Sequence, residues 1–157
     1  MTSKHKIASM ALAVLMALPG CIYISADSVT ATIDTREPTG AAEIVADYVE
    51  LNNACDAAGM ARLMHEDIEW LNISGDTVST VSSGKDTLSA ELASYMSNGC
   101  STQSALSDFS VNGPYVAVTE TVSWKGRDGA EQSQSATSVY EIENGLIRRV
   151  WYFPEVR

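Results

Sequence analysis

The sequence predicts an α+β domain in which helices cover one face of a bent antiparallel sheet. Two observations favour this fold class. Apolar residues recur at helical spacing between residues 41 and 58. After Cys100 the pattern changes to a period of two, and glycine-containing turns separate the alternating segments. A helical part followed by a run of strands is typical of the α+β class.

Length and composition favour a single globular domain. The chain has 157 residues, of which 45% are hydrophobic and 19% are charged. Its formal net charge of −10 repels phosphate backbones, so we expect no nucleic-acid partner. With 2 histidines and no glycine-rich nucleotide loop or paired-cysteine zinc motif, the sequence also predicts no metal site and no cofactor.

The first predicted helix covers residues 41–58. Thr39 is a candidate N-cap, and Glu43 lies in the first turn, where an acidic side chain suits the helix dipole. Gly59 is expected to end the helix. The side of this helix that is predicted to face the core carries residues at helical spacing, namely Ile44, Val45, Tyr48, Val49, Asn52 and Cys55.

A short helix, two strands and a third helix are expected next. The pattern predicts the short helix near residues 60–64, a strand at 68–73, an edge strand at 77–82 and the third helix from 84 to 98. One side of the third helix is apolar and carries Leu88, Leu92, Tyr95 and Met96. Between the short helix and the first strand, we expect the acidic segment 65–67 to form a solvated turn rather than a metal site.

Four long antiparallel strands are predicted after Cys100. Residues 116–124 alternate between apolar and polar, and residues 131–143 form a polar strand that becomes apolar late. Residues 146–153 form the last strand. Its turn, Asn144-Gly145, is a strong hairpin signal.

The N-terminus is predicted to be an export signal. A short basic start is followed by an uncharged segment at residues 7–18, which is too short for a transmembrane helix but has the length of a signal-peptide core. Residues 1–20 would then be removed. The segment from Leu18 to Cys21 is similar to a bacterial lipobox, which would make Cys21 a lipid-modified N-terminus.

Ordinary cleavage after Ala26 is the alternative, and it would release a soluble secreted protein. Residues 21–39 are polar and lack a sustained period, so we expect a tether. The folded domain is expected at residues 40–157. The predicted location is the periplasm or cell envelope, with contact to a membrane only through the lipid anchor.

The order of segments after residue 40 resembles the nuclear transport factor 2-like superfamily, in particular SnoaL-like proteins and ketosteroid isomerases. The resemblance covers a helix ending near an Asp, a short helix, an acidic turn before a strand, and a closing hairpin. It implies a cone-shaped fold, in which a curved sheet wraps around the long first helix and leaves a pocket open at one end. It also implies a homodimer formed through the sheet. The segments that carry it are residues 48–56, 63–70, 84–86, 122–126 and 140–147.

The resemblance does not extend to ketosteroid isomerase catalysis. Tyr48 matches the tyrosine that those enzymes use as an oxyanion donor. Asn72 stands where they have the general base, and Ser138 aligns with their protonated Asp. An amide cannot abstract a proton as a carboxylate does, so we do not expect this activity.

Glu120 is the most informative polar residue, because it shares a strand face with Val118 and Val122 that the family resemblance places in the pocket. A partly desolvated carboxylate there would suit a general acid or base. The alternatives are an ion pair with Arg148 or Arg149 and a place at a dimer seam. The predicted ligand-binding residues are Tyr48, Trp70, Asn72, Val118, Glu120, Val122, Ser138, Tyr140 and Tyr152.

Cys55 and Cys100 each lie near the C-terminal end of a predicted helix, in a chain that is expected to be exported. An oxidising compartment favours a disulfide between them. Two buried free thiols are the alternative.

Three functions stay open at this stage. The first is a cell-envelope module that binds a small, mainly apolar molecule. The second is a SnoaL-like isomerase, cyclase or dehydratase with Glu120 as general acid or base. The third is a structural dimerising domain whose core is filled. The sequence favours the first, because the catalytic acids of the isomerases are missing.

Overall fold

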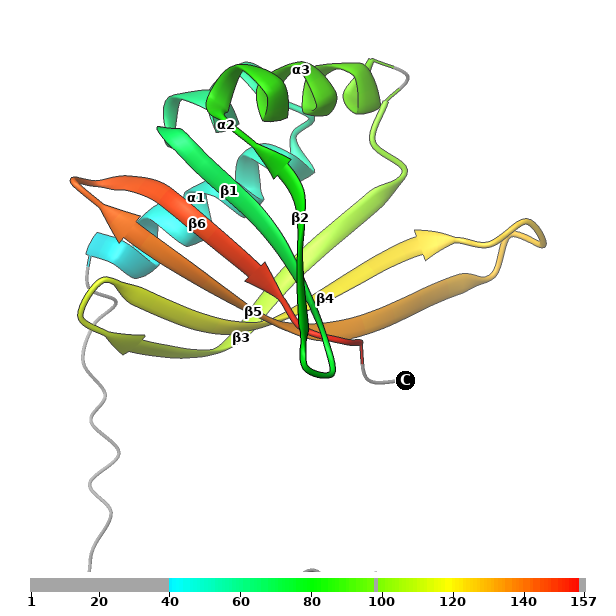
Figure 1. The fold of residues 1–157 in the computed structure, drawn as a ribbon. Helices are drawn as coiled ribbons and strands as arrows, with labels where there is room; N and C mark the ends of the chain where they lie inside the picture. Colours follow the sequence, from blue (N-terminus) through cyan, green and yellow to red (C-terminus); the bar gives the residue numbers. More distant parts are fainter. Residues whose placement is uncertain (1–39, 98, 156–157) are drawn as a thin grey trace, which may run out of the picture. The chain divides into compact units, whose positions relative to one another are not determined.

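The structure is a computed structural model and describes residues 40–97 and 99–155 (Figure 1). The predicted signal peptide, the lipobox with Cys21, the tether and the Thr39 cap lie outside these residues. The elements in chain order are α1 (Gly40–Asn53), α2 (Ala57–Arg62), β1 (Met64–Ser74), β2 (Thr77–Ser83), α3 (Lys85–Met96), β3 (Thr102–Asn112), β4 (Tyr115–Lys125), β5 (Glu131–Glu143) and β6 (Leu146–Tyr152).

One six-stranded sheet runs in the order β2-β1-β6-β5-β4-β3. All neighbours are antiparallel except β1 and β6, which are parallel. The predicted α+β architecture with a curved sheet is confirmed, but the sheet is mixed rather than wholly antiparallel. A parallel pair needs a long connection between its strands, and the chain between β1 and β6 supplies one.

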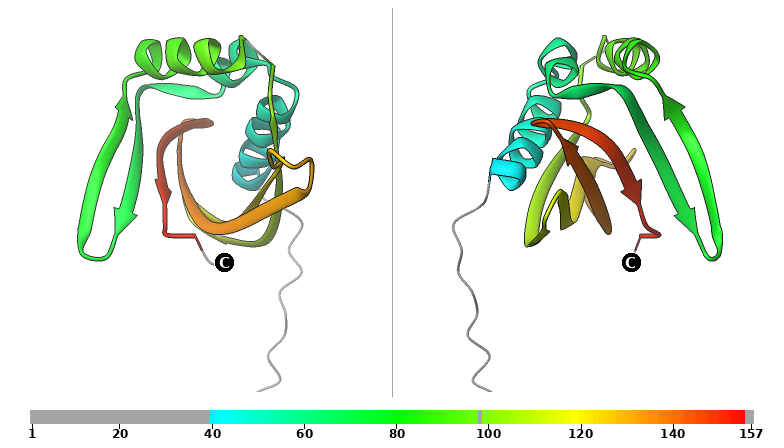
Figure 2. Two further views of the ribbon diagram at one scale, coloured as in Figure 1. Left: turned by 90° about the vertical axis from the view of Figure 1, so that its right-hand side faces the viewer. Right: turned by 60° about the vertical axis from the view of Figure 1, so that its left-hand side comes forward.

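The sheet curls around α1, and the three helices lie on its concave side (Figure 2). α1 packs against β3, β4 and β6, whereas α3 packs on α2, β1 and β2. Apolar residues from all three helices and from the concave sheet face form one core, which buries apolar surface from water. Its buried members are Ala42, Val45, Tyr48, Met60, Met64, Ile68, Leu88, Leu92, Met96, Val116, Val118, Tyr140, Ile147 and Val150.

The first helix ends earlier than predicted, and Gly59 does not end it. α1 stops at Asn53, and Cys55 takes the left-handed conformation with φ of 58°. Asp56 then caps α2 by accepting a hydrogen bond of 2.7 Å from the Gly59 backbone N–H. Gly59 lies inside α2, where a Cβ would clash with the Asp56 carboxylate. The glycine is therefore needed for close approach rather than for a turn.

The acidic segment that was expected to form a turn belongs to β1. This strand begins at Met64, and its pairing with β6 is irregular between Met64 and Glu69. Glu66 forms an ion pair of 3.0 Å with Lys85 at the start of α3. The irregular pairing keeps these polar residues at the surface while Met64 and Ile68 enter the core.

The predicted disulfide between Cys55 and Cys100 is confirmed. It joins the end of α1 to the segment that precedes β3, across 45 positions of sequence. Within the described ranges, no helix has the length and apolar character needed to cross a bilayer.

Candidate functional site

The concave face of the sheet sets out side chains in rows that follow from the strand register. One row places Leu106, Glu120 and Ala136 side by side on β3, β4 and β5. Strand residues alternate between faces, so Glu120 shares the concave face with the buried Val118. Glu120 therefore projects from the middle of an apolar sheet surface toward the helices.

Glu120 is only 7% exposed and is held by a tyrosine. Its Oε2 accepts a hydrogen bond of 3.0 Å from the Tyr152 hydroxyl. The Tyr140 and Tyr152 hydroxyl oxygens lie 3.3 Å apart. Because the single hydroxyl hydrogen of Tyr152 is used for the carboxylate, Tyr140 is the donor to Tyr152. The three groups form a short chain of hydrogen bonds that ends at Glu120.

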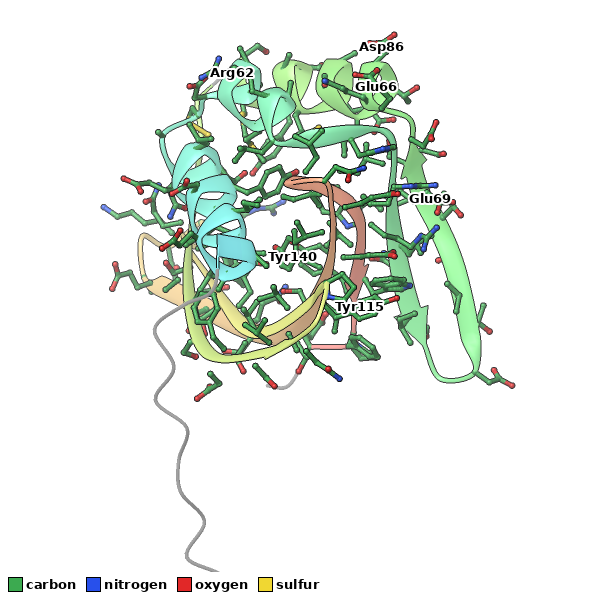
Figure 3. The ribbon with its side chains drawn as sticks, turned by 90° about the vertical axis from the view of Figure 1, so that its left-hand side faces the viewer. Arg62, Glu66, Glu69, Asp86, Tyr115 and Tyr140 are labelled. Carbon is green, nitrogen blue, oxygen red and sulfur yellow. A yellow bond between two sulfur atoms is a disulfide. The ribbon has the colours of Figure 1, made fainter. Side chains whose placement is uncertain are left out.

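Three tyrosines around Glu120 remain neutral. Burial raises the pKa of Tyr48, Tyr140 and Tyr152 well above the usual tyrosine value, and the neighbouring Glu120 charge adds to this rise. The Tyr48 ring meets the Tyr140 ring edge-on, with centroids 6.4 Å apart. Figure 3 shows Tyr140 in the interior, between α1 and the sheet. Each hydroxyl therefore keeps its hydrogen, and the Tyr48 hydroxyl is the one that makes no hydrogen bond to another described residue.

Neither arginine considered as a partner for Glu120 pairs with it, so that alternative is wrong. Arg149 is hydrogen-bonded to Glu69 at 2.7 Å and to Glu141 at 2.8 Å. Arg149 is in register with both carboxylates on the face opposite Tyr152, because successive strand residues point to opposite faces. Arg148 lies beside a register shift and donates to the Asp67 carbonyl.

A hollow with two lobes lies against the concave face of the sheet, and the helices line only its inner lobe. The inner lobe has a volume of about 390 Å³ and is lined mainly by aliphatic and aromatic residues of α1, α3 and the sheet. The outer lobe has a volume of about 530 Å³ and includes residues that follow β6. Residues that line both lobes are Trp70, Val81, Glu120, Val122 and Tyr152. The Glu120–Tyr152 pair thus lies where the lobes meet.

The structure brings most of the predicted ligand-binding residues to this hollow. Val118 and Ser138 are exceptions, since they are neighbours in register, are buried at 2% and 0% exposure, and line neither lobe. The predicted residues that line the inner lobe, the outer lobe or both are Tyr48, Trp70, Asn72, Glu120, Val122, Tyr140 and Tyr152.

Helix α3 contributes lining residues that were not predicted as site residues. Leu88, Glu91, Leu92 and Tyr95 all line the inner lobe. The apolar side of this helix was visible in the sequence, but a helix that covers a packed core shows the same spacing. The residues of the outer lobe near the C-terminus, such as Phe153, carried no sequence signal.

The charged residues known to line the hollow are carboxylates. Glu91, Glu120 and Glu155 line one or both lobes, and no Lys, Arg or His within residues 40–97 and 99–155 is among the lining residues. Across residues 40–97 and 99–155, no three His, Cys, Asp or Glu side chains are grouped as a metal site would require.

Comparison with known proteins identifies the family. Residues 45–150 match the model of the SnoaL-like domain. No curated protein is significantly similar to the chain in sequence.

Solved structures share the fold at low sequence identity. An uncharacterised cystatin-fold protein from Novosphingobium aromaticivorans is 22% identical, with a TM-score of 0.60 over 77% of this chain and 100% of its own. A putative ketosteroid isomerase from Kribbella flavida is 19% identical, with a TM-score of 0.59 over 75% of this chain and 80% of its own. A putative polyketide cyclase from Xanthomonas campestris is 19% identical, with a TM-score of 0.53 over 73% of this chain and 90% of its own.

The family match spans more than half of the chain, and the curved sheet around α1 is the fold of these neighbours. The chain therefore belongs to the SnoaL-like domain family.

Proposed function

We propose that the domain binds a small, mainly apolar organic molecule in the two-lobed hollow. The observation that carries this proposal is the position of Glu120, a buried carboxylate whose only hydrogen-bond donor among the described residues is Tyr152, at the junction of two lobes. Burying a carboxylate with a single neutral hydrogen-bond donor costs free energy. Proteins tolerate such a cost mainly at functional sites. An apolar pocket with a few converging polar groups is the usual form of a small-molecule site.

The polar groups around the hollow would orient such a ligand. Tyr48 lines the inner lobe, and its hydroxyl makes no hydrogen bond to another described residue. Asn72 lines the outer lobe and is exposed. Together with Glu120 they offer one polar group in each lobe and one at the junction.

Native mass spectrometry of the protein purified from its own host tests the proposal. We expect a small organic molecule to co-purify with the wild-type protein and to be lost from the Glu120→Gln variant. Glu131→Gln is the matched control, because Glu131 is an exposed carboxylate on β5 outside the lining of the hollow. Absence of any bound molecule from the wild-type protein would contradict the proposal.

Acid–base catalysis by Glu120 is the second candidate function. The names of two structural neighbours, a putative ketosteroid isomerase and a putative polyketide cyclase, support it. In such a reaction Glu120 would accept a proton from the ligand, and the Tyr48 hydroxyl would stabilise the developing oxyanion. The ketosteroid isomerase arrangement itself is absent, because Asn72 is exposed and carries an amide.

Proton exchange gives a direct test of this second function. Cyclic ketones incubated with the protein in deuterated water should gain deuterium beside the carbonyl, as measured by mass spectrometry. Glu120→Gln should abolish the exchange and Glu131→Gln should retain it. Equal exchange by both variants would exclude Glu120 as the base.

We also propose that the protein is exported and that Cys21 carries a lipid. The support is the basic start, the uncharged segment at 7–18 and the lipobox-like segment that ends at Cys21. Labelling with a fatty-acid analogue should give incorporation that the Cys21→Ser variant loses. Incorporation that survives this substitution would exclude Cys21 as the lipid site.

A further inference from the structure

The charged side chains that the described residues contribute to the hollow are carboxylates. Glu120 lies at the junction of the lobes, and Glu91 lines the inner lobe. The basic side chains of the described residues lie elsewhere, and four of them pair with surface carboxylates. Those four are Arg62 with Asp56, Lys85 with Glu66, and Arg148 and Arg149 with Glu69.

Glu120 lacks the cationic partner that a buried carboxylate usually has. The donor of its hydrogen bond is the Tyr152 hydroxyl, which is a neutral group. No ion pair to Glu120 exists among the described residues. The residues in register with Glu120 on the two neighbouring strands are Leu106 and Ala136, and both are apolar. A bound cation would supply the positive charge that none of the described residues places beside Glu120.

Aromatic rings surround the same carboxylate. Trp70 and Tyr152 line both lobes and stack with centroids 5.3 Å apart. Ring faces carry partial negative charge and attract cations within about 6 Å of the centroid. Further aromatic residues that line one lobe are Tyr48, Tyr95, Tyr140 and Phe153.

We propose that the ligand of this hollow is an organic cation, in which a protonated amine attached to a ring-bearing apolar group binds at Glu120. This inference rests on the proposed binding function and narrows it to one chemical class. The amine would form a charge-assisted hydrogen bond with the carboxylate, while the apolar group fills the inner lobe. Anions of the same size would be disfavoured, because Glu120 lies at the junction of the lobes and Glu91 lines the inner lobe.

Three water-soluble probes with one skeleton separate charge from apolar binding. They are 2-phenylethylamine, which is a cation at neutral pH, 2-phenylethanol, which is neutral, and phenylacetate, which is an anion. Titration followed by NMR of the tryptophan indole N–H signals reports binding near Trp70. We expect the amine to bind about tenfold more tightly than the alcohol, and phenylacetate to bind least.

Two variants assign this preference to one residue. Glu120→Gln keeps an oxygen that can accept the Tyr152 hydrogen bond but removes the charge, so it should abolish the preference for the amine over the alcohol. Glu131→Gln changes the net charge by the same amount at an exposed position and should leave the preference intact. An equal loss in both variants would overturn the inference, because net charge alone would then explain it.

The outcomes distinguish the two proposals. If the alcohol binds as tightly as the amine, the cation inference fails and the apolar binding function stands. If none of the three probes binds, both proposals fail. If the amine is preferred and only Glu120→Gln removes the preference, both are supported.

Discussion

The Tyr152 hydroxyl lies 3.0 Å from Glu120 Oε2, although β5 separates their two strands. The positions between them on β5 are Ala136, in register with Glu120, and Ser138, in register with Tyr152. Both side chains are small, so the Tyr152 side chain can extend across the intervening strand to the carboxylate. The polar centre of the hollow therefore depends on two small residues as well as on the pair itself.

Loss of the Tyr152 hydroxyl should destabilise the fold modestly. In Tyr152→Phe, Glu120 loses its only donor among the described residues, and we expect the free energy of unfolding to fall by about 1–3 kcal/mol, as for a hydrogen bond to a buried charged group. Chemical denaturation measures this. Tyr115→Phe removes a hydroxyl from an exposed tyrosine that makes no hydrogen bond to another described residue, and it should change stability by less than about 0.5 kcal/mol. Equal effects would show that the Glu120 contact contributes nothing.

A larger side chain at Ala136 should block the hollow. Ala136 lines the outer lobe beside Glu120, so leucine at this position would fill the space that a ligand needs. We expect Ala136→Leu to bind 2-phenylethylamine at least about tenfold more weakly, while its circular dichroism spectrum stays that of the wild type. Unchanged affinity would place the binding site elsewhere.

Stability should decline at alkaline pH because of the buried tyrosines. The pKa values of Tyr48, Tyr140 and Tyr152 are raised in the folded state, whereas unfolded tyrosines ionise near pH 10. Their contribution is complete below pH 10 and is lost as the pH rises above it, since only the unfolded chain gains free energy by ionising. Denaturation at several alkaline pH values measures the slope.

The matched variant for this pH dependence is Tyr48→Phe. Its hydroxyl has no hydrogen-bond partner among the described residues, so the substitution removes one ionising group at little structural cost. The fall in stability above pH 10 should be shallower in this variant. An identical slope would mean that Tyr48 ionises equally in the folded and unfolded states.

Reduction of the disulfide between Cys55 and Cys100 should lower the free energy of unfolding. Cys55 and Cys100 are 45 positions apart, and closing a loop of that size stabilises a fold by about 2–4 kcal/mol in the chain-entropy model. Denaturation with and without a reductant measures the difference. A variant with serine at both positions should match the reduced protein and show no response to the reductant.

Sequence patterns predicted the elements that depend on local chemistry. The helical spacing of α1 and α3, the alternation of β4 and the Asn144-Gly145 turn are visible in the chain itself. The parallel pairing of β1 with β6 was not predictable, because it joins segments that are far apart in sequence and alike in pattern. The predicted end of α1 was wrong because the sequence does not distinguish a glycine inside a helix, such as Gly59, from a glycine that ends one.

The sequence predicted several residues of the candidate site but not the hydrogen-bond partner of Glu120. Alternation along the strand gave the face of β4 that carries Glu120, and the resemblance predicted that this face lines a pocket and that Tyr48 is a hydrogen-bond donor there. The alternative that paired Glu120 with an arginine of β6 was wrong. The alternation of residues along a strand reveals neither the register shift beside Arg148 nor that the Tyr152 side chain extends across β5 to Glu120. A contact across an intervening strand depends on side-chain conformations, which the sequence pattern does not show.

The place of β6 in the sheet also bears on how the domain is made. This strand follows β1 to β5 in the sequence, yet it lies between β1 and β5 in the sheet. During synthesis the β1–β2 hairpin therefore cannot join β5, β4 and β3 until residues 146–152 have emerged. A chain truncated before Leu146 would leave β1 and β5 with open edges in the middle of the sheet.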